Sequence, residues 1–154
     1  GFQGRTTTLM ANGSTSTGDT YLSATVNLGS TAMSREMQKG AGFEQDTTDY
    51  LARVLGDDRI ERRVKHGSND RGDVAGVYIR GMRTVIECKC CKRMELSKWV
   101  DEAEEERLND DADIGLVVHK RKGYGDKKFG GNYVTMTLET LAAIIAGSKE
   151  LLND

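Results

Sequence analysis

The spacing of hydrophobic residues along the chain predicts three helices. Apolar side chains recur at helical intervals between residues 43 and 55, and Gly56 ends that pattern. A second stripe, which includes Trp99, predicts a helix over residues 95–109, and the apolar closing segment predicts a third over residues 138–152. Because Trp99 lies at helical spacing with apolar neighbours, we expect it to be a core residue rather than a base-stacking platform.

Shorter segments between these helices have patterns typical of extended chain. They comprise an extended piece at residues 60–65, a polar turn at 66–72, a strand at 73–80 that turns at Gly81 into a strand at 83–90, a short apolar strand at 114–119 and a strand at 133–137. The order of helices and strands predicts an α/β fold with a mixed central sheet flanked by helices.

The first part of the chain has a different composition from the rest. Residues 1–32 are rich in Thr, Ser and Gly, and Arg5 and Asp19 are their only charged residues. Within them residues 20–28 alternate as a strand does. The sequence therefore predicts an N-terminal arm with a short strand over residues 1–32, followed by one globular domain over residues 33–154.

The net charge of −2 gives no overall indication of a nucleic-acid or membrane partner. Charge is nevertheless distributed unevenly: residues 59–98 carry 11 Lys+Arg and 5 Asp+Glu, whereas residues 101–113 carry 8 acids and Arg107 as their only basic residue.

No apolar run approaches the roughly 20 residues that span a bilayer. No secretory signal is recognisable at the start of the chain, so we expect a cytoplasmic protein.

The three cysteines, Cys88, Cys90 and Cys91, form a poor disulfide framework because they are so close in sequence. Reduced thiols are the expected state, with Cys88 and Cys90 in the core. A zinc site is an alternative, but it would need His119 or His66 from distant segments and has no CxxC pair. Otherwise we expect His119 to be a structural histidine at a strand end, with a proton shuttle as the alternative.

Candidate chemistry lies on the strand at residues 83–90. Glu87 and Lys89 project to the same side of it, and Asp73 opens the preceding strand, so that pairing through Gly81 would place Asp73 across from Glu87. Two adjacent carboxylates repel each other, and Mg²⁺ or Mn²⁺ relieves that repulsion. Such a metal activates water against phosphodiesters, and Lys89 could stabilise the charge that develops. The alternative is a salt-bridged strand face without catalytic function.

Four separated features occur in a specific order: Lys39-Gly40 with Glu44, Gly67-Ser68, Gly72-Asp73, and Glu87-Cys88-Lys89. This series resembles the PD-(D/E)XK nuclease superfamily, most closely the Holliday junction resolvases of archaea and phages, over residues 38–120. The chain departs from the family in having Gly72 where the motif has Pro. It also has Glu102, Glu104 or Glu105 where some relatives use Gln.

The resemblance implies a restriction-endonuclease-like fold and a Mg²⁺-dependent (or Mn²⁺-dependent) endonuclease. The expected substrate is a four-way DNA junction cut by a homodimer, in the host cytoplasm if the protein is phage-encoded. Carried over by position, the catalytic residues are Glu44, Asp73, Glu87 and Lys89, and the metal-binding residues are Glu44, Asp73, Glu87 and Cys88. Ser68 resembles the loop serine that contacts the DNA backbone, and Lys39 belongs to the first motif.

Basic segments supply the other candidate DNA contacts. Arg62, Arg63 and Lys65 flank the turn before Asp73, and Lys120, Arg121 and Lys122 begin a Gly-rich loop with Tyr124 and Phe129. Cations interleaved with aromatic residues suit a phosphate-tracking surface, although a solvated loop is an equal alternative. The acidic segment 101–113 is expected to face away from DNA.

Two rival functions share this fold. One is a restriction- or repair-type endonuclease that cuts duplex or flap DNA. The other is a non-catalytic DNA-binding module.

Overall fold

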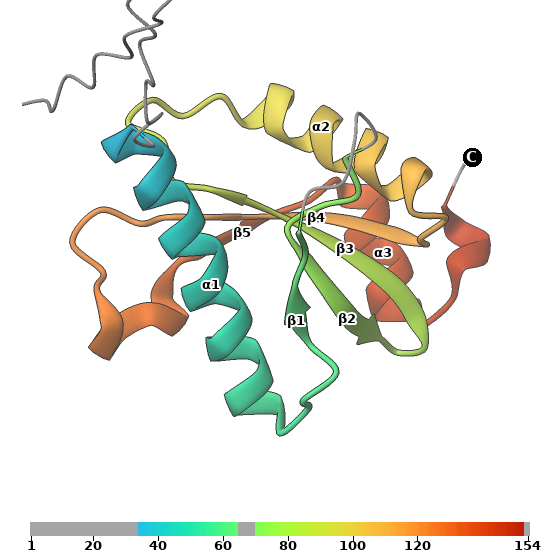
Figure 1. Ribbon diagram of the computed structural model, residues 1–154. Coiled ribbons are helices and arrows are strands. Elements are labelled where there is room, and N and C mark those ends of the chain that lie inside the picture. Colours follow the sequence, from blue (N-terminus) through green and yellow to red (C-terminus); the bar gives the residue numbers. More distant parts are fainter. Residues whose placement is uncertain (1–33, 65–69, 153–154) are drawn as a thin grey trace, which may run out of the picture. The chain divides into compact units, whose positions relative to one another are not determined.

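The computed structural model describes residues 34–64 and 70–152 (Figure 1). Its elements are α1 (Arg35–Leu55), β1 (Glu61–Arg62), β2 (Val74–Ile79), β3 (Met82–Lys89), α2 (Leu96–Asn109), β4 (Ile114–His119), η1 (Asp126–Gly131), β5 (Tyr133–Thr135), α3 (Leu138–Ala146) and η2 (Lys149–Leu151). The predicted arm at 1–32 with its strand at 20–28, and residues 65–69, lie outside the described residues.

The strands form one five-stranded sheet in the order β1-β2-β3-β4-β5. β3 and β4 run parallel, and the other neighbouring pairs are antiparallel. α1 and α3 pack on one face of the sheet through Phe43 and Ile144, whereas α2 packs on the other face through Trp99 and Ala103. The predicted α/β class, with a mixed sheet flanked by helices, is confirmed.

Two helix boundaries differ from the sequence prediction. α1 begins at Arg35 rather than residue 43, because the Ser34 side chain accepts a hydrogen bond from the Met37 N–H and caps the helix. Glu44 therefore lies in the middle of α1 and not near its start. α3 ends at Ala146 rather than residue 152, because Gly147 adopts the left-handed conformation (φ 68°) and closes the helix.

A β-bulge in β2 sets the register that the candidate site needs. Ile79 pairs with Met82 and Val77 with Thr84, but Val74 pairs with Ile86, one residue out of step. Continued one residue beyond β2, the register of Val74 puts Asp73 opposite Glu87, whereas the register of Val77 and Ile79 would put it opposite Cys88. Gly76 lies in the bulge with φ 80°, and a Cβ atom there would collide with the backbone carbonyl of Arg59.

β4 is buried along its whole length, as its apolar sequence predicted. α2 approaches it so closely that a Cβ atom on Gly115 would lie 2.7 Å from the Ala103 carbonyl oxygen. Trp99 is only 5% exposed, which confirms its prediction as a core residue. None of the helices formed by residues 34–64 and 70–152 is long and apolar enough to cross a bilayer.

Candidate active site

Asp73 and Glu87 form a buried pair of acids where β2 begins. The Asp73 N–H donates to the Ile86 carbonyl at 2.9 Å, and its Oδ2 accepts from the Cys88 N–H at 2.8 Å. The two residues are 2% and 5% exposed. Burial raises the pKa of Asp73 to about 8, and the charges of Glu87 and Glu44 add to this effect against the Cys88 hydrogen bond.

Lys89 lies on the same side of β3 as Glu87 and joins two acids. Its Nζ lies 2.6 Å from Glu87 Oε1 and 2.6 Å from Glu102 Oε2 on α2. Burial alone would lower the pKa of Lys89, but the hydrogen bonds to Glu102 and Glu87 outweigh it and leave that pKa raised. Lys89 is therefore a fixed positive charge beside the acid pair.

Glu106 on α2 is a further buried acid at this site, and the sequence interpretation missed it. It is 6% exposed. Burial, followed by the charge of Glu87, raises its pKa to about 9. Glu87 Oε2 and Glu106 Oε2 are both buried without a hydrogen-bond partner among the described residues. Because a buried acceptor without a donor is costly, these atoms mark a position where a proton or a cation would be stabilised.

The sequence interpretation considered Glu102, Glu104 and Glu105 at this helix. Glu102 does reach the site through Lys89, but Glu104 pairs with Arg107 at 2.7 Å and Glu105 is exposed. Glu106 follows Ala103 by three residues and Trp99 by seven, so helical spacing from these core residues is the signal that identifies it.

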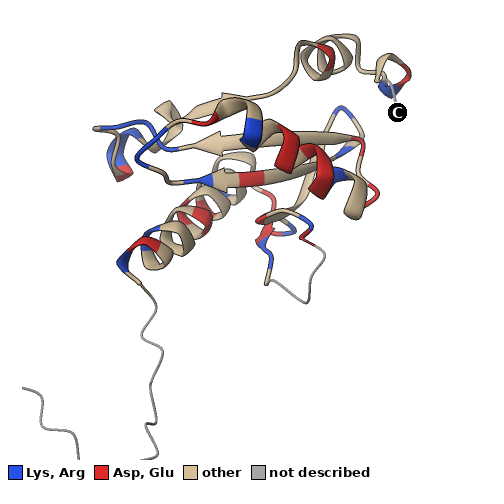
Figure 2. Cartoon of the chain, turned by 90° about the horizontal axis from the view of Figure 1, so that it is seen from above, with Lys and Arg blue, Asp and Glu red and all other residues tan. Residues whose placement is uncertain are grey.

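Acidic residues gather along α2, as Figure 2 shows. Three acids of segment 101–113 lie against other elements of the fold, and the orientation of this segment away from DNA stays a prediction. Glu102 pairs with Lys89, Glu106 is buried within electrostatic range of Glu87 and Asp73, and Asp110 is buried against Arg63 and Arg83. Their cationic partners, Lys89 for Glu102 and Arg63 with Arg83 for Asp110, account for the orientation of these two acids.

Glu44 reaches the edge of the site from α1. Its Oε2 accepts from Arg62 Nε at 2.9 Å and Nη2 at 2.6 Å. Its charge contributes to the raised pKa of Asp73, which places it within electrostatic range of the acid pair. The structure thus brings Asp73, Glu87 and Lys89 into one cluster, and holds Glu44 beside it through an ion pair.

The candidate DNA-binding cations fall into two groups. Arg62 is paired with Glu44, and Arg63 makes two 2.6 Å hydrogen bonds to Asp110, so both arginines serve internal ion pairs. Lys39 is exposed on α1, whereas Lys65 and Ser68 lie outside the described residues. The remaining three cations, Lys120, Arg121 and Lys122, line a pocket next to Lys89.

The cysteines are free thiols, and Cys88 and Cys90 contact the core as predicted. Burial raises the pKa of Cys88, so its side chain stays protonated in the metal-free protein, and its assignment as a metal ligand stays a prediction. Its contribution to the site is the N–H group that orients Asp73. His119 is buried and hydrogen-bonded to Thr135 Oγ1 at 2.8 Å, and burial lowers its pKa.

A divalent cation fits the donors of this site chemically. Carboxylate oxygens are the ligands that Mg²⁺ and Mn²⁺ prefer, and Glu87 Oε2 is buried and unpartnered in the described part of the chain. Within residues 34–64 and 70–152, no three His, Cys, Asp or Glu side chains are arranged as a preformed metal site. The zinc alternative therefore has no support from the described cysteines and His119, and His66 lies outside the described residues.

Comparisons of the chain with protein-family models, with curated proteins and with solved structures gave no match.

Proposed function

We propose that the protein is a Mg²⁺-dependent (or Mn²⁺-dependent) endodeoxyribonuclease of the PD-(D/E)XK type that cleaves branched DNA, with a Holliday junction as its substrate. The observation that carries this proposal is the buried Asp73–Glu87 pair with Lys89 on the same strand face. Burial of several acids around one cation is unfavourable for stability, and a catalytic metal gives a reason for it.

Asp73 and Glu87 are the residues that would hold the metal, with Glu44 or Glu106 as the neighbouring acid. The bound cation would polarise a phosphodiester oxygen and lower the pKa of a water molecule. Lys89 holds one oxygen of Glu87 and places a positive charge where negative charge develops during hydrolysis. The Cys88 N–H fixes the orientation of Asp73.

The partner and compartment follow from the same resemblance. A homodimer would match the two-fold symmetry of a four-way junction, with one site on each scissile strand. We propose that the protein acts in the cytoplasm, which would be the host cytoplasm if a phage encodes the protein.

The test compares cleavage of a four-way junction, a flap and a linear duplex in Mg²⁺, in Mn²⁺ and in EDTA. We expect metal-dependent cleavage of the junction, and a loss of at least 100-fold in Asp73→Asn and Glu87→Gln. Asp101→Asn is the matched control because Asp101 is exposed on α2. Cleavage of duplex or flap in preference to the junction would support the restriction- or repair-type alternative. DNA binding without cleavage in either metal would contradict the nuclease proposal and support the binding module.

A further inference from the structure

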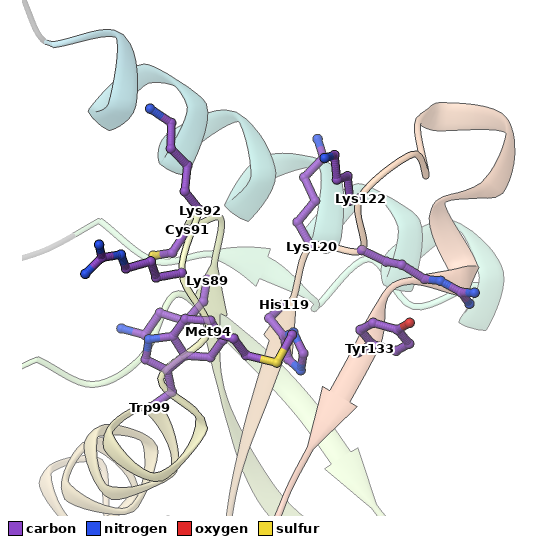
Figure 3. A pocket seen from close by; sticks show the side chains of 11 residues that line it. Lys89, Cys91, Lys92, Met94, Trp99, His119, Lys120, Lys122 and Tyr133 are labelled. Atoms are coloured by element: carbon purple, nitrogen blue, oxygen red, sulfur yellow. The ribbon is translucent and has the colours of Figure 1, made fainter.

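A cationic pocket of about 300 Å³ lies beside the candidate active site (Figure 3). Lys89 belongs both to this pocket and to the acid cluster, so the two sites are contiguous. The cations that line the pocket are Lys89, Lys92, Arg93, Lys120, Arg121 and Lys122. No acid is among the described residues that line it. The charge of the pocket therefore favours an anionic ligand.

Most of this positive charge is not neutralised by the protein. Lys89 is paired with acids, and Lys92 approaches Glu36 at 3.6 Å with both side chains largely exposed. In the described part of the chain, Arg93 and the cations of segment 120–122 make no ion pair within 4.0 Å. Cations without acidic partners are available to phosphate oxygens.

Arg121 is held in position by rings instead of by an acid. Its guanidinium carbon lies 4.1 Å from the Tyr124 ring centroid and 5.0 Å from that of Tyr133. Its backbone N–H donates to Asn132 Oδ1 at 2.8 Å, which ties the start of the loop to the segment before β5. Because the planar guanidinium is already ordered, little conformational entropy is lost when it binds a phosphate in a bidentate manner.

Aromatic rings line the same pocket, and one of them, Tyr133, lies against Arg121. Figure 3 shows Trp99, His119 and Tyr133 in a row from α2 across β4 to β5. The His119 ring centroid lies 5.4 Å from that of Trp99 and 5.4 Å from that of Tyr133. Trp99 and His119 are buried, but Tyr133 is 42% exposed and can present its ring to a ligand. Stacking on such a ring is how sequence-tolerant proteins bind nucleobases.

We propose that this pocket binds one nucleotide of an unpaired DNA strand, with a phosphate on Arg121 and its neighbouring lysines and the base against Tyr133. The proposal deepens the proposed nuclease function and rests on it for the identity of the nucleic acid. The pocket has the size of a small-ligand site, and a base that is paired and stacked in a duplex cannot enter it. An unpaired nucleotide held here would place the adjoining phosphodiester next to Lys89 and Glu87.

Trp99 provides a direct assay because it is the only tryptophan of the chain and lines the pocket. Oligothymidylate, its duplex with oligoadenylate, and thymidine monophosphate are each titrated in EDTA while Trp99 emission is recorded. We expect a saturable emission change with oligothymidylate, a weaker affinity for the mononucleotide, and at least tenfold weaker affinity for the duplex. Equal affinity for single strand and duplex, or no emission change with oligothymidylate, would overturn the proposal.

Single substitutions test whether oligothymidylate binds in this pocket. We expect Arg121→Gln to weaken oligothymidylate binding at least fivefold. Lys122→Gln is the second variant because its side chain is exposed and its loss leaves the fold intact; we expect at least a twofold loss. Lys149→Gln is the control: it removes the same charge, but Lys149 pairs with Asp113, which precedes β4 at the end of the strand remote from His119. Equal loss in Arg121→Gln and Lys149→Gln would contradict a specific pocket.

These measurements need neither metal nor cleavage, so the two proposals fail separately. Oligothymidylate binding without nuclease activity would support the nucleotide-binding pocket and contradict the nuclease proposal. Junction cleavage without a change in Trp99 emission would support the nuclease proposal and contradict the nucleotide-binding pocket.

Discussion

Substitution of Glu106 by Gln tests whether the candidate site is built at the expense of stability. Gln has the shape of Glu and no charge, and its amide N–H₂ can donate to Glu87 Oε2, which has no partner among the described residues. The wild-type carboxyl is 6% exposed, and burial and the Glu87 charge raise its pKa to about 9. We therefore expect Glu106→Gln to stabilise the metal-free protein.

The size of the effect depends on pH. Because the pKa of Glu106 is higher in the folded than in the unfolded chain, its contribution to stability is most favourable below pH 4.5 and is lost as the pH rises towards 9. At about 1.4 kcal/mol per pH unit, holding the carboxyl protonated at pH 7 costs about 3 kcal/mol. Glu106 and Asp73 both respond to Glu87, so their costs are not additive. We expect a gain of about 1–3 kcal/mol at pH 7 and less than about 1 kcal/mol at pH 5.

Urea unfolding in EDTA at pH 5, 6, 7 and 8 measures this gain. Glu105→Gln is the matched control because Glu105 is the exposed neighbour on α2, and we expect its stability to follow the wild type within about 0.5 kcal/mol. A Glu106→Gln protein that is less stable than wild type at pH 8, or a gain that does not increase with pH, would refute the reasoning.

Two other substitutions test the ion pairs and the bulge. Lys89→Met leaves Glu87 Oε1 without its donor, and we expect a loss of about 3 kcal/mol in urea unfolding. Lys98→Met removes only an exposed 3.6 Å pair with Glu102 and should change stability by less than about 1 kcal/mol; equal losses would show that the Lys89 pairs are ordinary surface pairs. Gly76→Ala combines φ 80° with a collision against the Arg59 carbonyl, so we expect a loss of about 2–4 kcal/mol. At Gly81, with φ 86° and open space around it, Ala should cost only about 1–2 kcal/mol; an equal cost at both positions would contradict the role assigned to the close approach.

Local patterns were sufficient to predict the centre of the sheet. The apolar run at residues 114–119 coincides with β4, and the alternation around Gly81 predicted β2 and β3 within one residue at each end. The same alternation placed Glu87 and Lys89 on one side of β3, where the structure has them. Side-chain periodicity in a strand does not depend on distant contacts, which is why these predictions succeeded.

Features that depend on tertiary contacts or on backbone irregularities were not predictable. Nothing in the local sequence reveals that Arg63 pairs with Asp110 across 47 residues, and its role as a DNA contact stays a prediction. The sequence of α2 is strongly acidic, and only the spacing of Glu106 from Trp99 indicates that Glu106 is buried. The bulge between Val74 and Val77 shifts the register of β2 by one residue, which no alternation pattern encodes.

The most direct test of the central claim is a metal titration by isothermal calorimetry, combined with junction cleavage on the same samples. Mn²⁺ is the probe, with wild type, Asp73→Asn, Glu87→Gln and Asp101→Asn compared at one pH. We expect wild type and Asp101→Asn to bind Mn²⁺ and to cleave the junction, and Asp73→Asn and Glu87→Gln to lose both properties. Undiminished Mn²⁺ binding or cleavage in Asp73→Asn and Glu87→Gln, or no Mn²⁺ binding by the wild type, would contradict the assignment of this acid pair as a catalytic metal site.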